Sequence, residues 1–83
     1  MATIKKIFFD VMSGTKDNNI KFDDLHRLLN ALQFESVRTK GSHHHYRNNN
    51  IAESVNIQKD GSKAKGYQVK QVREIIIDYN LEV

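Results

Sequence analysis

The spacing of apolar residues changes twice along this chain, and that change most constrains its fold. Up to residue 33, apolar residues recur every three or four positions, as in Ile4, Ile7 and Val11, which is typical of amphipathic helices. Between residues 53 and 58 they alternate with polar residues, which is typical of a strand buried on one face. Helical spacing returns near residue 67. We therefore expect an α+β fold with helices on one face of a sheet.

Three helices are expected. The first begins near Ile4 and stops at Ser13-Gly14, and a loop rich in turn-forming residues follows it. The second extends from about Phe22 to Gln33, and the last from about Tyr67 to Tyr79. The apolar stripe of the second helix consists of Phe22, Leu25, Leu28, Leu29 and Leu32.

Three strands are expected before the last helix, giving the order α-α-β-β-β-α. They extend over Phe34–Lys40, Ser42–Arg47 and Glu53–Gln58. In the first strand, Val37 is expected to point inward and its charged neighbours outward. Residues 62–65, between Gly61 and Gly66, are expected to form a basic loop.

The length and composition narrow the class of protein. The 83 residues fit one small domain, 1–83, in which residues 1–21 form an N-terminal helix and loop. There is no cysteine, so a disulfide framework is excluded and nothing marks the chain as secreted. No apolar run reaches the length of a membrane span, and the first residues lack a signal-peptide pattern. We expect a soluble, cytoplasmic protein with no membrane contact.

The basic residues gather in one part of the chain. Residues 36–73 contain eight Lys and Arg against two Glu and Asp, whereas residues 1–35 contain five of each sign. A local surplus of six positive charges favours a surface for a polyanion, although a solvated basic face would have the same composition.

Three consecutive histidines lie within this basic block, in Arg38-Thr39-Lys40-Gly41-Ser42-His43-His44-His45-Tyr46-Arg47. A Gly-Ser-His run can be the remnant of an expression tag. This run is internal, has only three histidines and continues into Tyr46-Arg47, which argues against a tag. Histidine exchanges protons near neutral pH, and Arg and Lys bind phosphate, so the segment is suited to gripping or cutting RNA.

Alternation along a strand divides the histidines between two faces. His43 and His45 would share one face with Arg47, and His44 would share the other with Tyr46. Because the helices cover only one face, at least one histidine is expected beside a helix and at least one in solvent. Tyr46 is expected in the core rather than as a platform for base stacking. Tyr67 is expected to pack at the start of the last helix rather than to contact RNA.

Metal-free cleavage of RNA needs a base for the 2′-OH proton, an acid for the leaving oxygen and cations near the phosphate. His43 could take either proton role, with Arg38, Lys40 or Arg47 supplying charge, or it could be only a hydrogen-bonded strand residue. His-x-His could instead chelate zinc, but a closed zinc site needs four ligands. The chain has no cysteine, and His26 lies far away in sequence on the second helix. We expect no metal and no cofactor.

The segment Gly41-Ser42-His43-His44-His45-Tyr46-Arg47 closely resembles the signature of the HicA toxin family, small mRNA interferases of type II toxin–antitoxin systems. The segment from Leu28 to Phe34 resembles the family's first core helix, and the segment from Lys65 to Ile75 resembles its final helix. The resemblance covers roughly residues 22–81.

This resemblance implies a double-stranded-RNA-binding-like fold, α-β-β-β-α, with residues 1–21 as an extension. It implies an endoribonuclease acting on mRNA, and neutralisation by a cognate HicB-type antitoxin. It implies one essential histidine, which maps to His43, or to His44 as the alternate. The candidate RNA contacts are Arg38, Lys40, Gly41, Ser42, Arg47, Lys63 and Lys65.

The chain departs from the family pattern in one further respect. Many members have a Pro-His-Pro-like step after the third strand, whereas this chain has no proline, and Lys63 or Lys65 is the candidate substitute as a phosphate contact. Two other functions stay open from the sequence. One is a non-catalytic RNA-binding module, and the other is an interaction protein whose sheet edge or helices bind only a partner.

Overall fold

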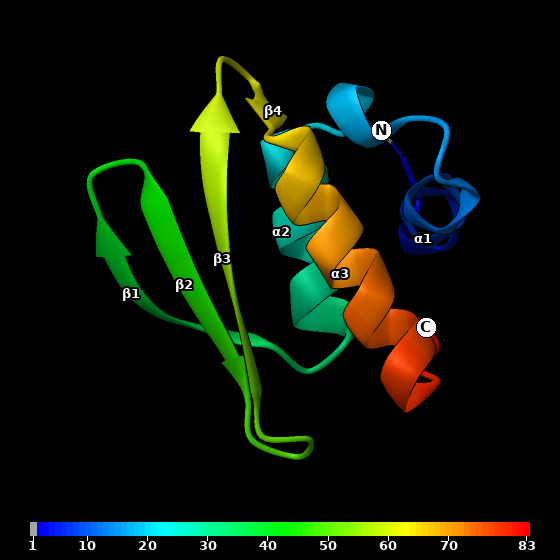
Figure 1. Ribbon diagram of the computed structural model, residues 1–83, viewed down its shortest axis with the longest axis vertical. Helices are drawn as coiled ribbons and strands as arrows, with labels where there is room; N and C mark the ends of the chain where they lie inside the picture. The colour runs from blue at the N-terminus through cyan, green and yellow to red at the C-terminus, as the bar shows by residue number, and fades with distance from the viewer. Residues whose placement is uncertain (1) are drawn as a thin grey trace.

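An antiparallel sheet in the order β1-β2-β3-β4 lies against helices on one face in the computed structural model, which describes residues 2–83 (Figure 1). The predicted α+β fold is confirmed, with a short fourth strand added to the expected three. The elements are α1 (Ile4–Ser13), a 3-10 turn η1 (Asp17–Asn19), α2 (Phe22–Ala31), β1 (Glu35–Lys40), β2 (His43–Asn48), β3 (Glu53–Asp60), β4 (Lys63–Ala64) and α3 (Gly66–Tyr79).

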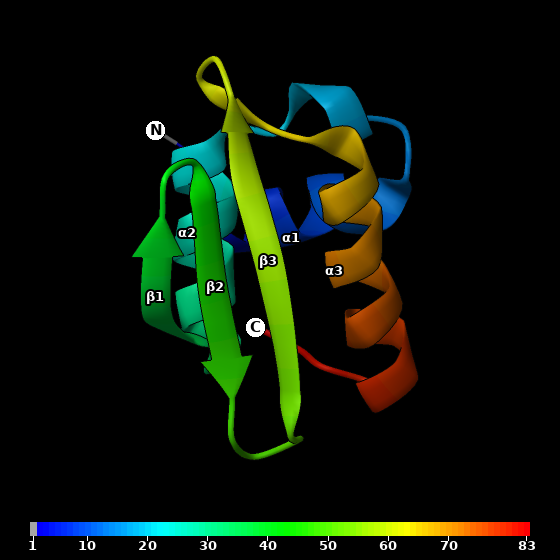
Figure 2. The same cartoon turned by 60° about the vertical axis from the view of Figure 1, so that its left-hand side comes forward.

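The molecule has three layers. Helices α2 and α3 cover one face of the sheet, and α1 lies on the far side of these two helices (Figure 1). Turning the molecule brings the other face of β1, β2 and β3 to the front, where no helix covers it (Figure 2). The expectation of helices on one face is therefore confirmed. We call the uncovered side the outer face of the sheet and the covered side the inner face.

The core lies between the inner face and the helices. Leu25, Leu28 and Leu29 of α2 are fully buried because their spacing places them on one side of the helix. Full burial of each such side chain contributes about 1.5–3 kcal/mol. The other buried apolar residues come from every layer: Ile7, Val11, Ile20, Phe22, Leu32, Phe34, Tyr46, Val55, Ile57, Ala64, Val69, Val72 and Ile76.

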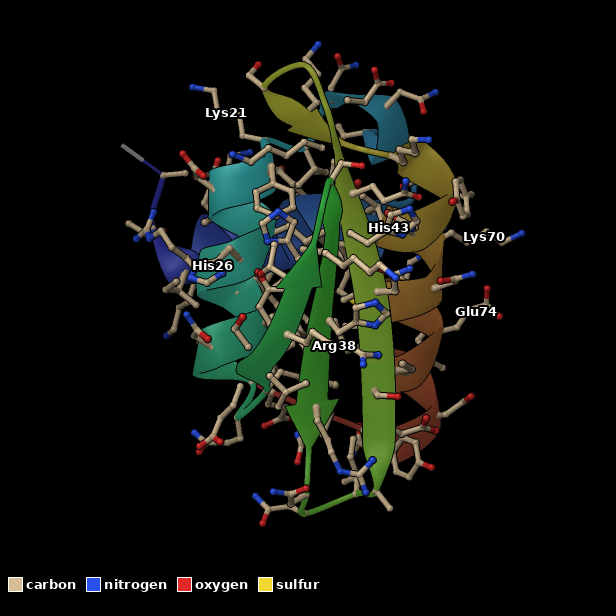
Figure 3. All side chains as sticks on the ribbon, turned by 90° about the vertical axis from the view of Figure 1, so that its left-hand side faces the viewer. Lys21, His26, Arg38, His43, Lys70 and Glu74 are labelled. Carbon is tan, nitrogen blue, oxygen red and sulfur yellow. The ribbon has the colours of Figure 1, made fainter. Side chains whose placement is uncertain are left out.

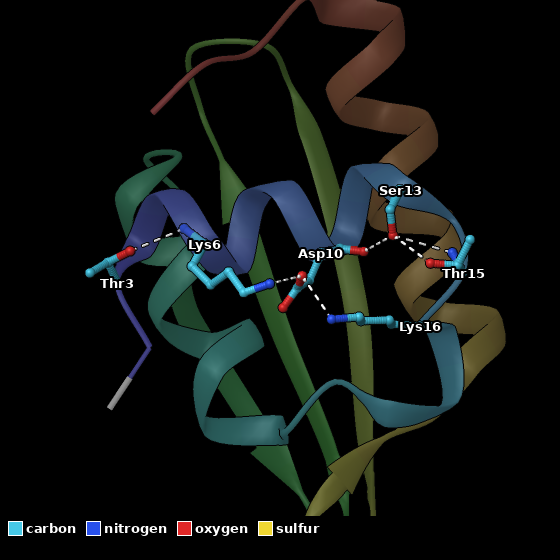
Figure 4. Close-up of polar contacts among 6 residues, drawn as sticks. All are labelled: Thr3, Lys6, Asp10, Ser13, Thr15 and Lys16. Carbon is cyan, nitrogen blue, oxygen red and sulfur yellow. Dashed lines mark hydrogen bonds and ion pairs between the residues drawn. The ribbon is translucent and has the colours of Figure 1, made fainter.

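Polar contacts at the surface define the ends of α1 (Figure 4). The backbone N–H of Lys6 donates to Thr3 Oγ1 at 3.1 Å, which caps the first turn. Gly14 ends the helix with a left-handed φ of 73°. Asp10 accepts from Lys6 at 2.9 Å and from Lys16 at 3.3 Å, and the hydrogen bond from Lys6 lowers the pKa of the Asp10 carboxyl. Exposed pairs of this kind add little stability.

A more enclosed ion pair connects η1 to α3. The Arg73 guanidinium donates to both Asp17 carboxylate oxygens, at 2.8 and 3.1 Å, and to the Val11 carbonyl at 3.1 Å. The two-pronged pairing fixes α3 relative to both α1 and η1. The Arg73–Asp17 hydrogen bond raises the pKa of the Arg73 guanidinium.

Two Gly-Ser turns form hairpins at the same end of the sheet (Figures 1 and 2). Gly41 has φ 60° between paired Lys40 and His43, and Gly61 has φ 64° between paired Asp60 and Lys63. Glycine adopts this left-handed conformation without strain. The predicted boundaries were wrong here: β2 begins at His43 rather than at Ser42, and the predicted basic loop contributes β4.

The prediction that Val37 points inward was also wrong, because Val37 is 60% exposed. The pairing of β1 with β2 shifts between Ser36 and Arg38, which leaves Val37 as the extra residue of a β-bulge. Alternation read from sequence cannot detect such an insertion. The helix bounds shifted less: α2 ends at Ala31 rather than near Gln33, which itself has φ 74°, and α3 begins at Gly66.

The two edges of the sheet differ. Beside β4, the chain just before α2 forms a bridge, in which the Phe22 N–H donates to the Ser62 carbonyl and the Ala64 N–H to the Ile20 carbonyl. At the opposite edge, β1 pairs only with β2 among residues 2–83, and all its side chains are exposed.

Candidate active site

His43 is the first residue of β2 and lies on the outer face, directly after the Gly41-Ser42 turn (Figure 3). Its imidazole is exposed and contacts two amide side chains of β3. The ring Nδ1 lies 3.1 Å from Asn56 Nδ2, and the ring Nε2 lies 3.1 Å from Gln58 Nε2. These contacts arise because His43 pairs with Gln58 and alternate residues of β3 share its face.

Gln58 is in turn held by the first turn of α3. Its Oε1 accepts hydrogen bonds from the Tyr67 hydroxyl and from Gln68 Nε2, both at 3.1 Å. The backbone N–H of Gln58 donates to Gln68 Oε1 at 2.6 Å. Gln68 is 3% exposed. A buried polar side chain therefore holds Gln58, and Gln58 in turn contacts the His43 ring. We call Gln58, Tyr67 and Gln68 the glutamine relay.

Sequence reasoning missed this relay, and it assigned Tyr67 to packing, which was wrong because Tyr67 is 57% exposed. Asn56 and Gln58 occupy the polar positions between Val55 and Ile57 on the strand that pairs with the histidine strand. That alternation could have placed them on the histidine face. The contribution of Gln68 depends on where α3 begins, which the sequence left uncertain.

His44 faces the inner side, where its ring lies 4.6 Å from the Phe22 ring at the start of α2. Its Nδ1 is 3.5 Å from Thr39 Oγ1. Burial lowers the pKa of His44, and electrostatic repulsion from Lys59 and His26 lowers it further. The expected division of the histidines is therefore confirmed, with His43 in solvent and His44 beside a helix.

His26 is closer to the histidine strand than its sequence position suggested. Its Nδ1 lies 2.6 Å from the hydroxyl of Tyr46, which is 1% exposed, and its ring meets that of Tyr46 edge-on. The core position predicted for Tyr46 is confirmed. Across residues 2–83, no group of three or more His, Cys, Asp or Glu side chains is placed to hold a metal ion.

The candidate RNA-binding residues fall into two groups. Arg38 and Arg47 line a shallow hollow of the outer face together with His45 and Ser54, and Figure 3 shows Arg38 on the same face as His43. Arg47 also donates to Asn49, at 2.8 Å, at the far end of β2 from His43. This separation shows that Arg47 and His43 do not converge on one point, although they share a face.

The second group surrounds His43 at the hairpin end. Lys40 pairs with His43 across the Gly41-Ser42 turn. The backbone N–H of Lys65 donates to the Gln58 carbonyl at 3.2 Å, which places Lys65 beside the relay. Lys63 instead extends toward η1 and donates to Asn19 Oδ1 at 2.9 Å. Lys40, Lys65 and the turn are thus the candidates nearest to His43.

The fold and site define a small α+β protein with a helix-free, basic sheet face that carries an exposed histidine. Residues 22–77 match the family described as the HicA toxin of bacterial toxin–antitoxin systems. The match covers more than half of the 83 residues, and the chain belongs to this family. Membership assigns the chain to the toxins of bacterial toxin–antitoxin systems and implies a cognate antitoxin.

Comparison with curated proteins and with solved structures found no match. The family match begins at Phe22, so α1 and η1 lie outside it. None of the helices within residues 2–83 has the length and apolar character needed to cross a membrane.

Proposed function

We propose that this toxin is a metal-independent endoribonuclease that cleaves mRNA in the cytoplasm and uses His43 for proton transfer. The observation that carries the proposal is the position of His43, exposed on the helix-free face with Lys40 beside it and Arg38 on the same face. His44, the alternate, is a weaker candidate because its ring packs on Phe22 at the inner side.

In the proposed reaction, His43 takes the proton of the 2′-OH as that oxygen attacks the adjacent phosphorus. The bond from phosphorus to the 5′ oxygen breaks, which leaves a 2′,3′-cyclic phosphate on one fragment, and the 5′ oxygen of the other fragment takes a proton from water. Lys40 and Lys65 stabilise the negative charge that builds on the phosphate. Arg38 and Arg47, farther along the outer face, hold the flanking strand.

The test is cleavage of RNA by the purified protein, with His43→Ala as the variant. Loss of a proton-transfer group lowers a rate by about 10² to 10⁴. We expect that loss for folded His43→Ala, and unchanged wild-type activity in EDTA. RNA binding without cleavage would support the non-catalytic RNA-binding module instead. Activity removed by EDTA and restored by zinc would support metal chemistry.

We further propose that the antitoxin covers the outer face around His43 with an acidic surface, which would exclude RNA directly and speed association. A stable complex should bury more than about 1,000 Å². Hydrogen exchange of the free toxin and the complex tests this, with stronger protection of residues 38–47 expected in the complex. Unchanged protection there would indicate inhibition from a distance.

A further inference from the structure

The orientation of the Gln68 amide can be assigned from one fixed donor. A backbone N–H can only donate, and that of Gln58 lies 2.6 Å from Gln68 Oε1, so this atom is the acceptor. The other end of the same amide, Gln68 Nε2, is therefore a donor, and it faces Gln58 Oε1 at 3.1 Å.

The orientation of the Gln68 amide in turn determines the orientation of the Gln58 amide. Gln58 Oε1 accepts from Gln68 and also from the Tyr67 hydroxyl, so two donors hold the oxygen end of this side chain toward α3. The nitrogen end then faces His43. Gln58 Nε2, which lies 3.1 Å from the ring Nε2, can only donate to it.

A neutral imidazole has one N–H and one bare nitrogen. Since Gln58 donates to Nε2, that nitrogen is bare and the proton lies on Nδ1. Nδ1–H needs an acceptor, and the Asn56 side chain lies 3.1 Å away. Asn56 Oδ1 is buried and lacks a hydrogen-bond partner among the described residues. Turning this amide end for end places Oδ1 against the ring proton.

We infer that the glutamine relay fixes His43 as the Nδ1–H tautomer, with Nε2 as the bare nitrogen. Gln58 occupies the lone pair of Nε2 in the free protein, so the substrate 2′-OH must displace the Gln58 N–H before Nε2 can accept its proton. Gln58 and Gln68 are positioning residues in this scheme, because they act through the imidazole and not on RNA. The catalytic part of the inference rests on the proposed function, whereas the tautomer is a property of the free protein.

The most direct test replaces the hydrogen-bond donor that faces His43 Nε2 with an acceptor. In Gln58→Glu, one carboxylate oxygen can still accept from Tyr67 and Gln68, while the other faces His43 and needs a donor. The imidazole proton should therefore move to Nε2. We expect ¹⁵N NMR, recorded well above the ordinary imidazole pKa of about 6.5 and at a pH where the ring shifts no longer change, to show Nδ1–H in the wild type and Nε2–H in the variant.

The matched control is Gln71→Glu, which adds the same charge at an exposed position of α3. It should leave the His43 tautomer unchanged. Gln58→Met, which fills the space without donors or acceptors, should give a mixture of tautomers. Nε2–H in the wild type, or no change in Gln58→Glu, would overturn the inference.

Kinetics with RNA give the second readout. Loss of a positioning group can cost about 10²-fold in rate. We expect Gln58→Met to lower kcat by up to about that factor, because part of the His43 population then carries its proton on Nε2 and cannot act as the base. KM should stay nearly unchanged if Gln58 acts only through the imidazole. A rise in KM at constant kcat would place Gln58 in substrate binding and overturn the positioning role. Wild-type protein with the Nδ1–H tautomer but no RNA cleavage would refute the proposed function alone.

Discussion

His43 and His44 are neighbours in the chain, yet the outer and inner faces of the sheet give them different surroundings. On the outer face, His43 meets solvent and the amides of Asn56 and Gln58. On the inner face, His44 lies against the Phe22 ring, and burial lowers its pKa. Identical residues in a row on a strand therefore point alternately to the two faces of the sheet. The surroundings on each face decide the exposure, contacts and pKa of the residues that point to it.

The largest expected effect separates the two histidines by what their removal changes. His43→Ala should lower the RNA cleavage rate by about 10² to 10⁴ and leave the thermal unfolding midpoint close to that of the wild type. His44→Ala should retain most of the activity and lose stability, because the packing on Phe22 is lost. The comparison breaks if folded His44→Ala is inactive while His43→Ala is active.

The next effect concerns the charge of the outer face and the hairpin end. Five RNA contacts, by Arg38, Lys40, Arg47, Lys63 and Lys65, predict a slope of about −3 to −4 for log K against log salt with single strands. Filter binding over a salt series measures this slope. Lys63→Glu with Lys65→Glu should weaken binding, whereas Lys5→Glu on α1, in the outermost helix layer, should not. A flat salt response would contradict the polyanion surface.

A smaller effect tests the inner face. Tyr46→Phe removes the buried hydroxyl that bonds to His26, which should lower the free energy of unfolding by about 0.5–1.5 kcal/mol in urea denaturation. Tyr79→Phe is the control, since its hydroxyl bonds to Glu53 at an exposed position and should change stability by less than about 0.5 kcal/mol. Equal losses of unfolding free energy in both variants would show that the buried His26–Tyr46 hydrogen bond stabilises the fold no more than the exposed Tyr79–Glu53 hydrogen bond.

The smallest effect is a pH dependence of stability. Because the pKa of His44 is lower in the folded protein than in the unfolded chain, the unfolded chain binds more protons as the solution is acidified. The stability linked to this group is present above about pH 6.5 and is lost as the pH falls. Thermal unfolding should therefore show a smaller loss on acidification for His44→Gln than for the wild type. Parallel curves would remove His44 as a source of acid sensitivity.

Much of the fold followed from the period of apolar residues, because burial of one helix side or one strand face leaves a regular pattern. The stripe from Phe22 to Leu32 located α2, and Val55 and Ile57 located β3. Val37 was misplaced because a bulge changes the alternation without changing composition. Strand β4 was missed because two residues are too few to show a period.

The site divides in the same way. The position of His43 on a face followed from local alternation within one strand. The relay did not, since it depends on the pairing of His43 with Gln58 and on the packing of Gln68 beneath the sheet. Those are contacts between segments distant in sequence, and a single sequence carries no direct record of them. His26 was judged remote for the same reason.

The exposed edge of β1 has a consequence for how copies of this chain meet one another. An unpaired strand edge is a template for pairing with a second chain, and proteins commonly block it with charged side chains or a bulge. Strand β1 has both, with Glu35, Arg38 and Lys40 along its length and the bulge at Val37. The bulge twists the backbone of β1 away from the flat, regular geometry that pairing with another strand needs. The irregularity that made the orientation of Val37 unpredictable from sequence therefore also disfavours edge-to-edge association of two copies.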